Sequence, residues 1–202
     1  MNGVTFRVVT PDDAEELLAI YAPYVASTAV SFECTVPTGD EFRRRIKAIS
    51  AEYPYIAAMS DGRIVGYAYA SSFHAREAYR HTCETSIYVA ADCHGKGIGR
   101  RLYSELEKLL VSQNVFVCYA CVTTTDREDD PYLTDASVRF HEKVGYSVIG
   151  RHENCGYKFG RWYGIVWMEK VLSERPSSPA PFIPFPHVAE NENKCDLFSQ
   201  NP

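Results

Sequence analysis

The sequence has no excess of positive charge, no apolar run of membrane-spanning length and no basic-then-apolar segment at its start. Its 202 residues carry a formal net charge of −5, which argues against nucleic acid or an anionic membrane as a main partner. A membrane helix needs about 20 apolar residues in a row, and a secretory signal needs a charged and then an apolar stretch. We therefore expect no membrane span and no leader.

The seven cysteines lack the regular spacing of a disulfide framework. An odd number of cysteines spread along the chain favours reduced thiols and hence a cytoplasmic protein. Cys118 and Cys121 form a Cys-x-x-Cys, but it lies in an apolar stretch and no second ligand pair follows. We interpret both thiols as core side chains and expect no metal; metal binding or redox chemistry is the less favoured alternative.

Strand-like and helix-like segments alternate along the chain. Runs rich in β-branched and aromatic residues indicate strands, and apolar residues with a period near 3.6 indicate helices. Asp61-Gly62 marks a hairpin turn, and Thr38 with Glu41 forms a capping box. The expected strands are 4–9, 55–59, 64–73, 87–89, 115–123, 146–154 and 161–171, and the expected helices are 11–21, 39–51, 98–110 and 135–145.

This order predicts an α/β fold, a mixed central β-sheet with helices on both faces. We expect one domain over residues 1–172, and the apolar fraction of 46% is enough for a sizeable core. Residues 173–202 hold six of the eleven prolines and show no periodicity, so we expect a disordered or loosely packed tail. The alternative is that part of this tail lies along the body or a neighbouring subunit.

The segment 84–103 joins a strand to a helix through a turn rich in glycine and basic residues. A helix N-terminus presents free backbone N–H groups at the positive end of the helix dipole. Glycines let the backbone approach a bulky phosphate, and basic side chains add charge. An ordinary glycine-containing turn is the alternative. We predict a site for a phosphorylated ligand formed by Gly95, Lys96, Gly97, Gly99 and Arg100.

Two well-known phosphate loops do not fit this turn. The P-loop requires Ser or Thr directly after its lysine, whereas Lys96 is followed by Gly97. The dinucleotide fingerprint requires Gly-x-Gly-x-x-Gly, whereas the spacing here is Gly-x-Gly-x-Gly. The segment instead resembles the Gln/Arg-x-x-Gly-x-Gly/Ala loop of the GNAT superfamily of acyl-CoA-dependent N-acetyltransferases. The resemblance implies a pyrophosphate site for acetyl-CoA, with one side-chain contact weakened because His94 replaces Gln or Arg.

Residues 30–33, 73–89, 137–146 and 156–162 are similar to segments of the phosphinothricin acetyltransferase branch, and the matches span roughly residues 4–171. This resemblance implies the GNAT fold, with two parallel strands splayed apart at the acetyl-CoA site, and a homodimer. It also implies a small amino-acid-like acceptor such as phosphinothricin, methionine sulfone or methionine sulfoximine. Two departures are visible: the loop 123–134 is longer, and Thr134 stands where Asn is common.

Acetyl transfer requires a neutral amine, yet amines are largely protonated at neutral pH, so a nearby carboxylate can act as the base. By resemblance Glu84 is this base, and His141 replaces the usual tyrosine as a proton donor or as part of the base relay. A backbone N–H near Val89 is the candidate donor to the oxyanion. The resemblance places acetyl-CoA against Ile87, Tyr88, Val89, His94, Gly95, Lys96, Gly97, Ile98, Gly99, Arg100 and Ser137.

The acceptor site is less clear from the sequence. Arg76 has the planar guanidinium that clamps a carboxylate, and the proposed acceptor-side residues are Phe32, Arg76, Tyr79, Thr85 and Ser86. Simpler roles stay open: Glu84 as a solvent-facing strand residue, His141 as a core histidine, and Phe32 and Trp162 as core aromatics. Two other functions also stay open, a non-catalytic acyl-CoA sensor and an enzyme that acetylates another small amine or a protein amine.

Overall fold

The computed structural model describes residues 3–191 and 198. Seven strands form one sheet in the order β1-β2-β3-β4-β5-β7-β6. The β4–β5 pair is parallel, and the other neighbouring pairs are antiparallel. The strands are β1 Thr5–Val8, β2 Tyr55–Ser60, β3 Arg63–Ser72, β4 Thr82–Val89, β5 Val117–Thr124, β6 Ser147–Lys158 and β7 Arg161–Val171. The helices are α1 Ala14–Ser27, α2 Gly39–Ser50, α3 Ile98–Ser112, α4 Ala136–Lys143 and α5 Phe185–Asn191. The predicted mixed sheet is confirmed.

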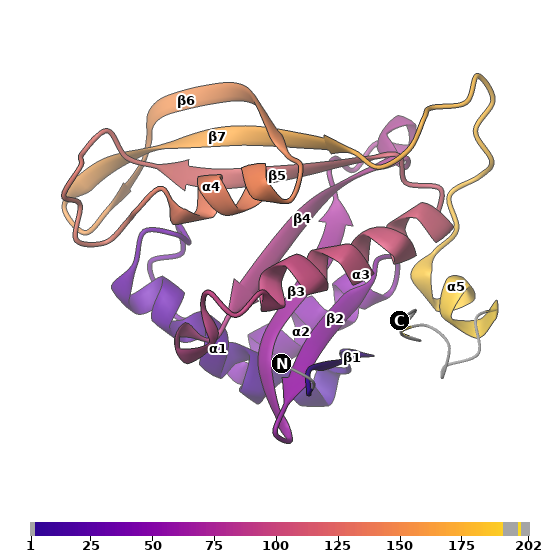
Figure 1. The fold of residues 1–202 in the computed structure, drawn as a ribbon, viewed down its shortest axis with the longest axis horizontal. Helices are drawn as coiled ribbons and strands as arrows, with labels where there is room; N and C mark the ends of the chain where they lie inside the picture. Colours follow the sequence, from indigo (N-terminus) through magenta and orange to yellow (C-terminus); the bar gives the residue numbers. More distant parts are fainter. Residues whose placement is uncertain (1–2, 192–197, 199–202) are drawn as a thin grey trace.

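Helices cover both faces of this sheet (Figure 1). Side chains alternate between the two faces along β2, as the period of a strand requires. Ile56 and Ala58 join the core beneath α3, whereas Tyr55 and Ala57 join a second core beneath α1 and α2. The helix α3 therefore lies on one face and the α1–α2 pair on the other, with the glycine-rich turn between β4 and α3.

One predicted local signal forms as expected and one forms in part. The Thr38 Oγ1 accepts a hydrogen bond from the Glu41 N–H at 3.2 Å and caps α2, whereas the Glu41 carboxylate pairs with Arg44 and Arg45, so only half of the predicted capping box is present. Asp61 and Gly62 have φ angles of 51° and 78° in the turn between β2 and β3, which matches the positive φ that such hairpin turns require. The first helix differs, because a 3₁₀ turn at Pro11–Asp13 precedes α1.

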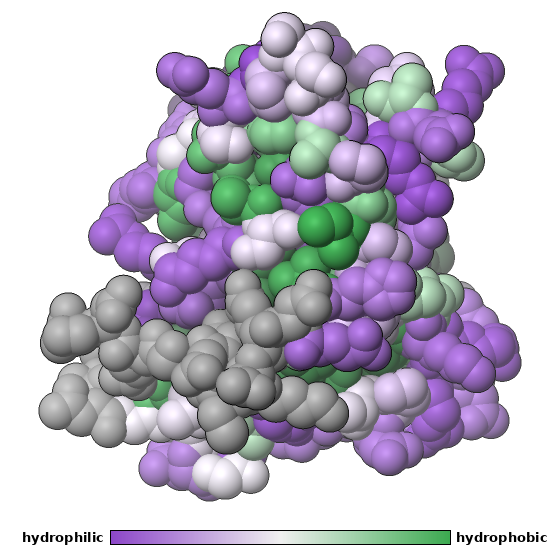
Figure 2. All heavy atoms as spheres, turned by 90° about the vertical axis from the view of Figure 1, so that its right-hand side faces the viewer, coloured by the Kyte–Doolittle hydropathy of each residue, from purple (hydrophilic) through white to green (hydrophobic). Residues whose placement is uncertain are grey.

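The expectation of a loosely packed tail is wrong for residues 181–189. Phe185 and Val188 are each 4% exposed and belong to the main core. The buried Gln113 at the end of α3 donates its Nε2 to the Ile183 carbonyl at 2.8 Å, and Asn114 donates to the Pro181 carbonyl at 2.7 Å. On this side of the molecule, hydrophobic residues gather between hydrophilic ones (Figure 2). Apolar side chains among the prolines therefore fix this segment, as the alternative for the tail allowed.

The interpretation of the Cys-x-x-Cys as two core thiols is right for one residue and wrong for the other. Cys118 is fully buried, with its Sγ 3.6 Å from the Sγ of Cys83, whereas Cys121 is exposed. Positions three apart on a strand point to opposite faces, so the two thiols of this motif do not converge. Among the described residues, no group of three or more His, Cys, Asp or Glu side chains is arranged to hold a metal.

Candidate active site

The parallel pair β4–β5 opens into a split halfway along its length. The two strands pair only at Thr82–Val117, Cys83–Cys118 and Glu84–Tyr119. Beyond Glu84, β4 pairs only with β3 and β5 only with β7, and at the fork the Thr85 Oγ1 donates to the Tyr119 carbonyl at 3.2 Å. Beyond the fork, the two strands therefore leave each other's backbone groups without a ladder partner.

The strand ladder indicates which backbone groups face the split. Ala90 donates its N–H to the Val65 carbonyl on the β3 side at 2.9 Å. Because N–H groups of successive residues in a strand point to opposite sides, those of Val89 and Ile87 point away from β3. This direction suits the oxyanion contact predicted for Val89, although that role stays a prediction.

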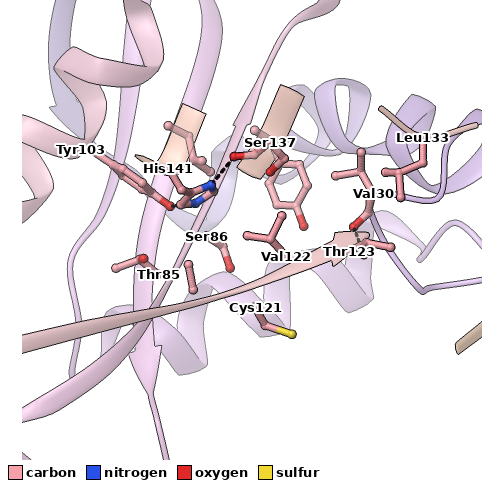
Figure 3. A pocket seen from close by; sticks show the side chains of 13 residues that line it. Val30, Thr85, Ser86, Tyr103, Cys121, Val122, Thr123, Leu133, Ser137 and His141 are labelled. Atoms are coloured by element: carbon pink, nitrogen blue, oxygen red, sulfur yellow. Dashed lines mark hydrogen bonds between the residues drawn. The ribbon is translucent and has the colours of Figure 1, made fainter. Parts of the chain in front are cut away.

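A cavity of about 450 Å³, including open space at its mouth, fills the split. Side chains of β4, β5 and α4 converge on it (Figure 3). Of the predicted site residues, Thr85, Ser86, Ile87, Tyr88, Ser137 and His141 line it. Sequence reasoning missed the other lining residues, which are Val30, Tyr103, Ala120, Cys121, Val122, Thr123 and Leu133.

The split joins the two faces of the sheet. Successive side chains of β4 point to opposite faces, so Glu84, Ser86 and Tyr88 share the face that α1 and α2 cover. Tyr88 packs there against Tyr21 at 4.8 Å between ring centroids. Thr85 lies on the α3 face, where its hydroxyl is 2.9 Å from that of Tyr146. Two reactants can thus meet through the split from opposite sides.

The turn between β4 and α3 has the backbone that an anion site needs. Gly95 and Gly97 have φ angles of 72° and 77°, and a Cβ at either position would meet nothing within 4 Å. Both glycines are therefore explained by backbone conformation. Gly99 has another explanation, because a Cβ there would lie 3.0 Å from the Phe140 ring. Lys96 and Arg100 are exposed beside the start of α3.

His94 ties this turn to the end of β4. Its Nε2 lies 2.9 Å from the Val89 carbonyl and 2.8 Å from the hydroxyl of Tyr24, which itself donates to the Val89 carbonyl at 2.6 Å. A protonated Nε2 satisfies this arrangement because the carbonyl can only accept. His94 thus organises the backbone at the mouth of the split.

Glu84 occupies the last position at which β4 pairs with β5, and its side chain is half-buried on the α1–α2 face. Burial raises the pKa of this carboxyl above its usual value, and the nearby His74 opposes the shift. A carboxylate with a raised pKa is a better proton acceptor than an ordinary one. Glu84 therefore has the electrostatic character of a general base.

His141 is 5% exposed and lies between α4 and α3. Its Nδ1 is 2.8 Å from the Ser137 carbonyl, and its Nε2 is 3.0 Å from the Tyr103 hydroxyl. Because the carbonyl can only accept, Nδ1 carries the proton, and Nε2 accepts from Tyr103. Burial lowers the pKa of His141, and the hydrogen bond to the Ser137 carbonyl raises it by less. The net lowering favours a neutral imidazole. The hydroxyl of Tyr103 is thus a second candidate proton donor.

Three of the predicted acceptor residues do not line the cavity. Arg76 is exposed just before the 3₁₀ turn Glu77–Tyr79. Tyr79 packs against Phe73 and His74, and Phe32 is 37% exposed beside Gly156, so it is not a core residue. Trp162, for which a core position also stayed open, is exposed beside Tyr157. The roles given to Arg76, Tyr79 and Phe32 stay predictions.

The longer loop 123–134 is anchored beside the cavity. The fully buried carboxylate of Asp130 accepts hydrogen bonds from Arg161 at 3.1 Å, from the Tyr163 hydroxyl at 3.1 Å and from the Tyr132 N–H at 2.9 Å. Leu133 follows directly and lines the cavity. The loop thus shapes one wall of the site through Leu133.

In the described part of the chain, no helix is both long and apolar enough to cross a membrane. The sequence model described as an acetyltransferase (GNAT) domain matches residues 6–167. The chain is 36% identical over 170 residues to phosphinothricin N-acetyltransferase of Alcaligenes faecalis, covering 84% of this chain and 83% of that protein.

Two solved structures are similar in fold and sequence. The phosphinothricin acetyltransferase of Sinorhizobium meliloti in complex with AcCoA superimposes with a TM-score of 0.78 at 28% identity, over 91% of this chain and 98% of that one. The ribosomal-protein-alanine N-acetyltransferase of Brucella melitensis gives a TM-score of 0.74 at 30% identity, over 82% of this chain and 98% of that one.

Proposed function

The chain belongs to the GNAT acetyltransferase family and is an N-acetyltransferase, and on this basis we propose that it transfers the acetyl group of acetyl-CoA to the amino group of a small amino-acid-like molecule. The observation that carries the proposal is the split between β4 and β5, lined from both faces of the sheet and bordered by a glycine turn at the start of α3. A similar structure is solved with AcCoA.

The residues present fit acetyl-CoA as a substrate. Gly95 and Gly97 hold the turn in the left-handed region of φ, and free N–H groups at the start of α3 suit a pyrophosphate. Lys96 and Arg100 add positive charge. The thioester then lies in the split, where the Val89 N–H stabilises the oxyanion of the tetrahedral intermediate.

The acceptor amine approaches from the α1–α2 face. Glu84, directly or through one water, removes its proton and makes the nitrogen nucleophilic. The departing thiolate takes a proton from the Tyr103 hydroxyl, which gives up its hydrogen bond to His141 Nε2, and the phenolate regains a proton from solvent before the next turnover. In this arrangement His141 acts through Tyr103, because its own Nδ1 proton is held by the Ser137 carbonyl.

Relatives named for phosphinothricin and one from Salmonella typhimurium named for methionine sulfoximine and methionine sulfone favour a small amino acid or analogue of these types as acceptor. Arg76 holds the acid group of this substrate in our proposal. The Brucella melitensis structure is named for a ribosomal protein, so a protein or peptide amine is the second candidate. The presence of both Glu84 and His141 counts against a sensor without activity.

We also propose a homodimer in the cytoplasm. Ile149, Tyr157 and Trp162 on the β6–β7 pair are each more than half exposed, Tyr157 and Trp162 lie 5.2 Å apart between ring centroids, and large exposed apolar side chains at the edge of a sheet favour a protein contact. The cytoplasmic location rests on the uneven number and spacing of cysteines.

A turnover screen tests the function. Purified protein is incubated with acetyl-CoA and a panel of free amino acids, their sulfone and sulfoximine analogues, phosphinothricin and alanine-terminated peptides, and free thiol release is measured. We expect turnover with the amino-acid-like amines. Turnover with peptides alone would overturn the substrate class, and no turnover with any amine would overturn the enzymatic proposal.

A further inference from the structure

The lysine at the end of β6 is buried, which is unusual for this residue type. Lys158 is 5% exposed, and its Nζ donates to the Ser31 carbonyl at 2.6 Å. The ammonium also lies 5.0 Å from the centre of the Phe159 ring. Burial lowers the pKa of this amine. A buried ammonium is unfavourable without compensating contacts, so its position calls for an explanation.

Lys158 holds a segment that several parts of the chain fix in place. The Ala29 N–H donates to the Tyr132 carbonyl at 2.9 Å, and Thr123 donates to the Val30 carbonyl at 3.2 Å. The Ser31 hydroxyl lies 2.7 Å from that of Tyr21 and accepts the Glu33 N–H at 3.2 Å. Residues 29–33 are thus tied to α1, to β5, to the loop 123–134 and, through Lys158, to β6.

This segment forms one wall of the active-site cavity. Val30 lines the cavity together with Ser86 and Tyr88 of β4. Tyr21, which meets Ser31, also packs edge-on against Tyr88. The segment therefore borders the α1–α2 side of the split, from which the acceptor amine approaches in the proposed function.

We propose that Lys158 is a positioning residue for the acceptor amine: its bond to the Ser31 carbonyl fixes residues 29–33 and thereby sets the width of the acceptor side of the cavity. This inference rests on the proposed function. It assigns Lys158 no contact with either substrate. It predicts that losing the bond weakens acceptor binding while acetyl-CoA binding is unaffected.

The test compares Lys158→Met, Lys158→Arg and a matched control, Lys170→Met. Lys170 donates its Nζ to a main-chain carbonyl, that of Val144, at 2.6 Å and to the Glu107 carboxylate at 2.7 Å, so its loss removes a similar bond and an ion pair as well. For Lys158→Met we expect the acceptor KM to rise roughly tenfold, the effect of one charge-assisted hydrogen bond, with an unchanged KM for acetyl-CoA. Lys158→Arg should restore most of the acceptor KM, and Lys170→Met should leave it unchanged.

Amide hydrogen exchange on the same proteins gives a result that does not depend on turnover. Lys158→Met should exchange faster over residues 28–36 and not over 95–105. Unchanged exchange over residues 28–36 would overturn the inference, and so would an equal rise in acceptor KM in Lys158→Met and Lys170→Met. If the wild type acetylates no amine, the proposed function fails, and the exchange data alone decide whether Lys158 holds the segment.

Discussion

The hydroxyl of Tyr103 lies 3.0 Å from the Nε2 of His141, and both side chains are almost fully buried at the inner end of the cavity. Tyr103 belongs to α3, which follows the glycine turn, and His141 belongs to α4, which follows the loop 123–134. The bond therefore joins these two helices. Burial raises the pKa of Tyr103, so the phenol is protonated at neutral pH and is a weaker acid than an exposed tyrosine. A neutral proton donor is thereby held beside the split.

Replacing Tyr103 tests this pair. Tyr103→Phe removes the hydroxyl and leaves the buried Nε2 of His141 without its donor, which should lower stability by about 1–3 kcal/mol. If the hydroxyl protonates the departing thiolate, kcat should also fall by roughly 10²-fold or more. Denaturant unfolding and steady-state kinetics measure the two effects. Tyr146→Phe, which removes a neighbouring hydroxyl bonded to Thr85, is the control, and equal losses of kcat in both variants would contradict the assignment.

Gly97→Glu should abolish acetyl-CoA binding, because the new side chain and its negative charge would occupy the anion site. Calorimetric titration with acetyl-CoA measures this. Gly62→Glu is a matched control, because Gly62 has a φ of 78° against 77° for Gly97 and neither Cβ would meet an atom within 4 Å. The two variants carry the same backbone strain, so binding that survives equally in both would place the phosphate elsewhere.

Much of this arrangement could be predicted from the sequence because its signals are local. The hairpin at Asp61-Gly62, the cap at Thr38 and the turn before Ile98 each depend on neighbouring residues. Tyr103 and Leu133 were missed because their role depends on which distant segments meet. The split itself is set by the partners of β4 and β5, and no residue in either strand encodes that separation. The docking of Phe185 likewise depends on the surface that α3 and Glu52 present.

Glu84→Gln should leave acetyl-CoA affinity unchanged and lower turnover by roughly 10²–10⁴-fold, the usual contribution of a general base. The loss should be greatest below neutral pH but above the raised pKa of Glu84, where the amine is protonated and wild-type Glu84 is ionised. Rate profiles against pH for both proteins measure this. Glu77→Gln, in the exposed turn before β4, should behave as wild type. A Glu84→Gln profile that matches wild type at every pH would show that the base lies elsewhere.

The same variant has a second expected outcome, on stability. The pKa of Glu84 is raised in the folded state, so ionisation of this carboxyl disfavours folding, and stability falls as pH rises through that pKa. Glu84→Gln removes this penalty and should raise Tm near neutral pH while leaving it unchanged at low pH. A lower Tm at neutral pH would mean that the carboxylate is stabilised by its surroundings.

Arg76→Lys should raise the KM for an acidic-headed acceptor by roughly ten- to a hundredfold, since an ammonium cannot reproduce the planar fork of a guanidinium. Acetyl-CoA binding should not change. Arg76 is exposed and precedes the turn Glu77–Tyr79, so the substitution should leave Tm unchanged, and any kinetic effect can be attributed to binding. Arg127→Lys, on an exposed part of the longer loop, is the control. An unchanged acceptor KM in Arg76→Lys would remove Arg76 from the site.

Phe185→Ala should lower stability by about 3–5 kcal/mol, as expected for a large side chain removed from a packed core. Phe185 is 4% exposed, and its N–H donates to the Glu52 carbonyl at 3.0 Å. Glu52 also pairs with Arg80 at 2.9 Å, and Arg80 lies over the Phe182 ring. The segment 181–189 thus touches the residues that lead into β4, yet it lies outside the cavity.

Thermal unfolding of Phe185→Ala should therefore show the loss of stability, while the KM values for acetyl-CoA and for the acceptor stay the same below the transition. His187→Ala, on the exposed side of α5, should leave Tm unchanged, and an equal Tm for Phe185→Ala and wild type would mean that this segment does not contribute to the core.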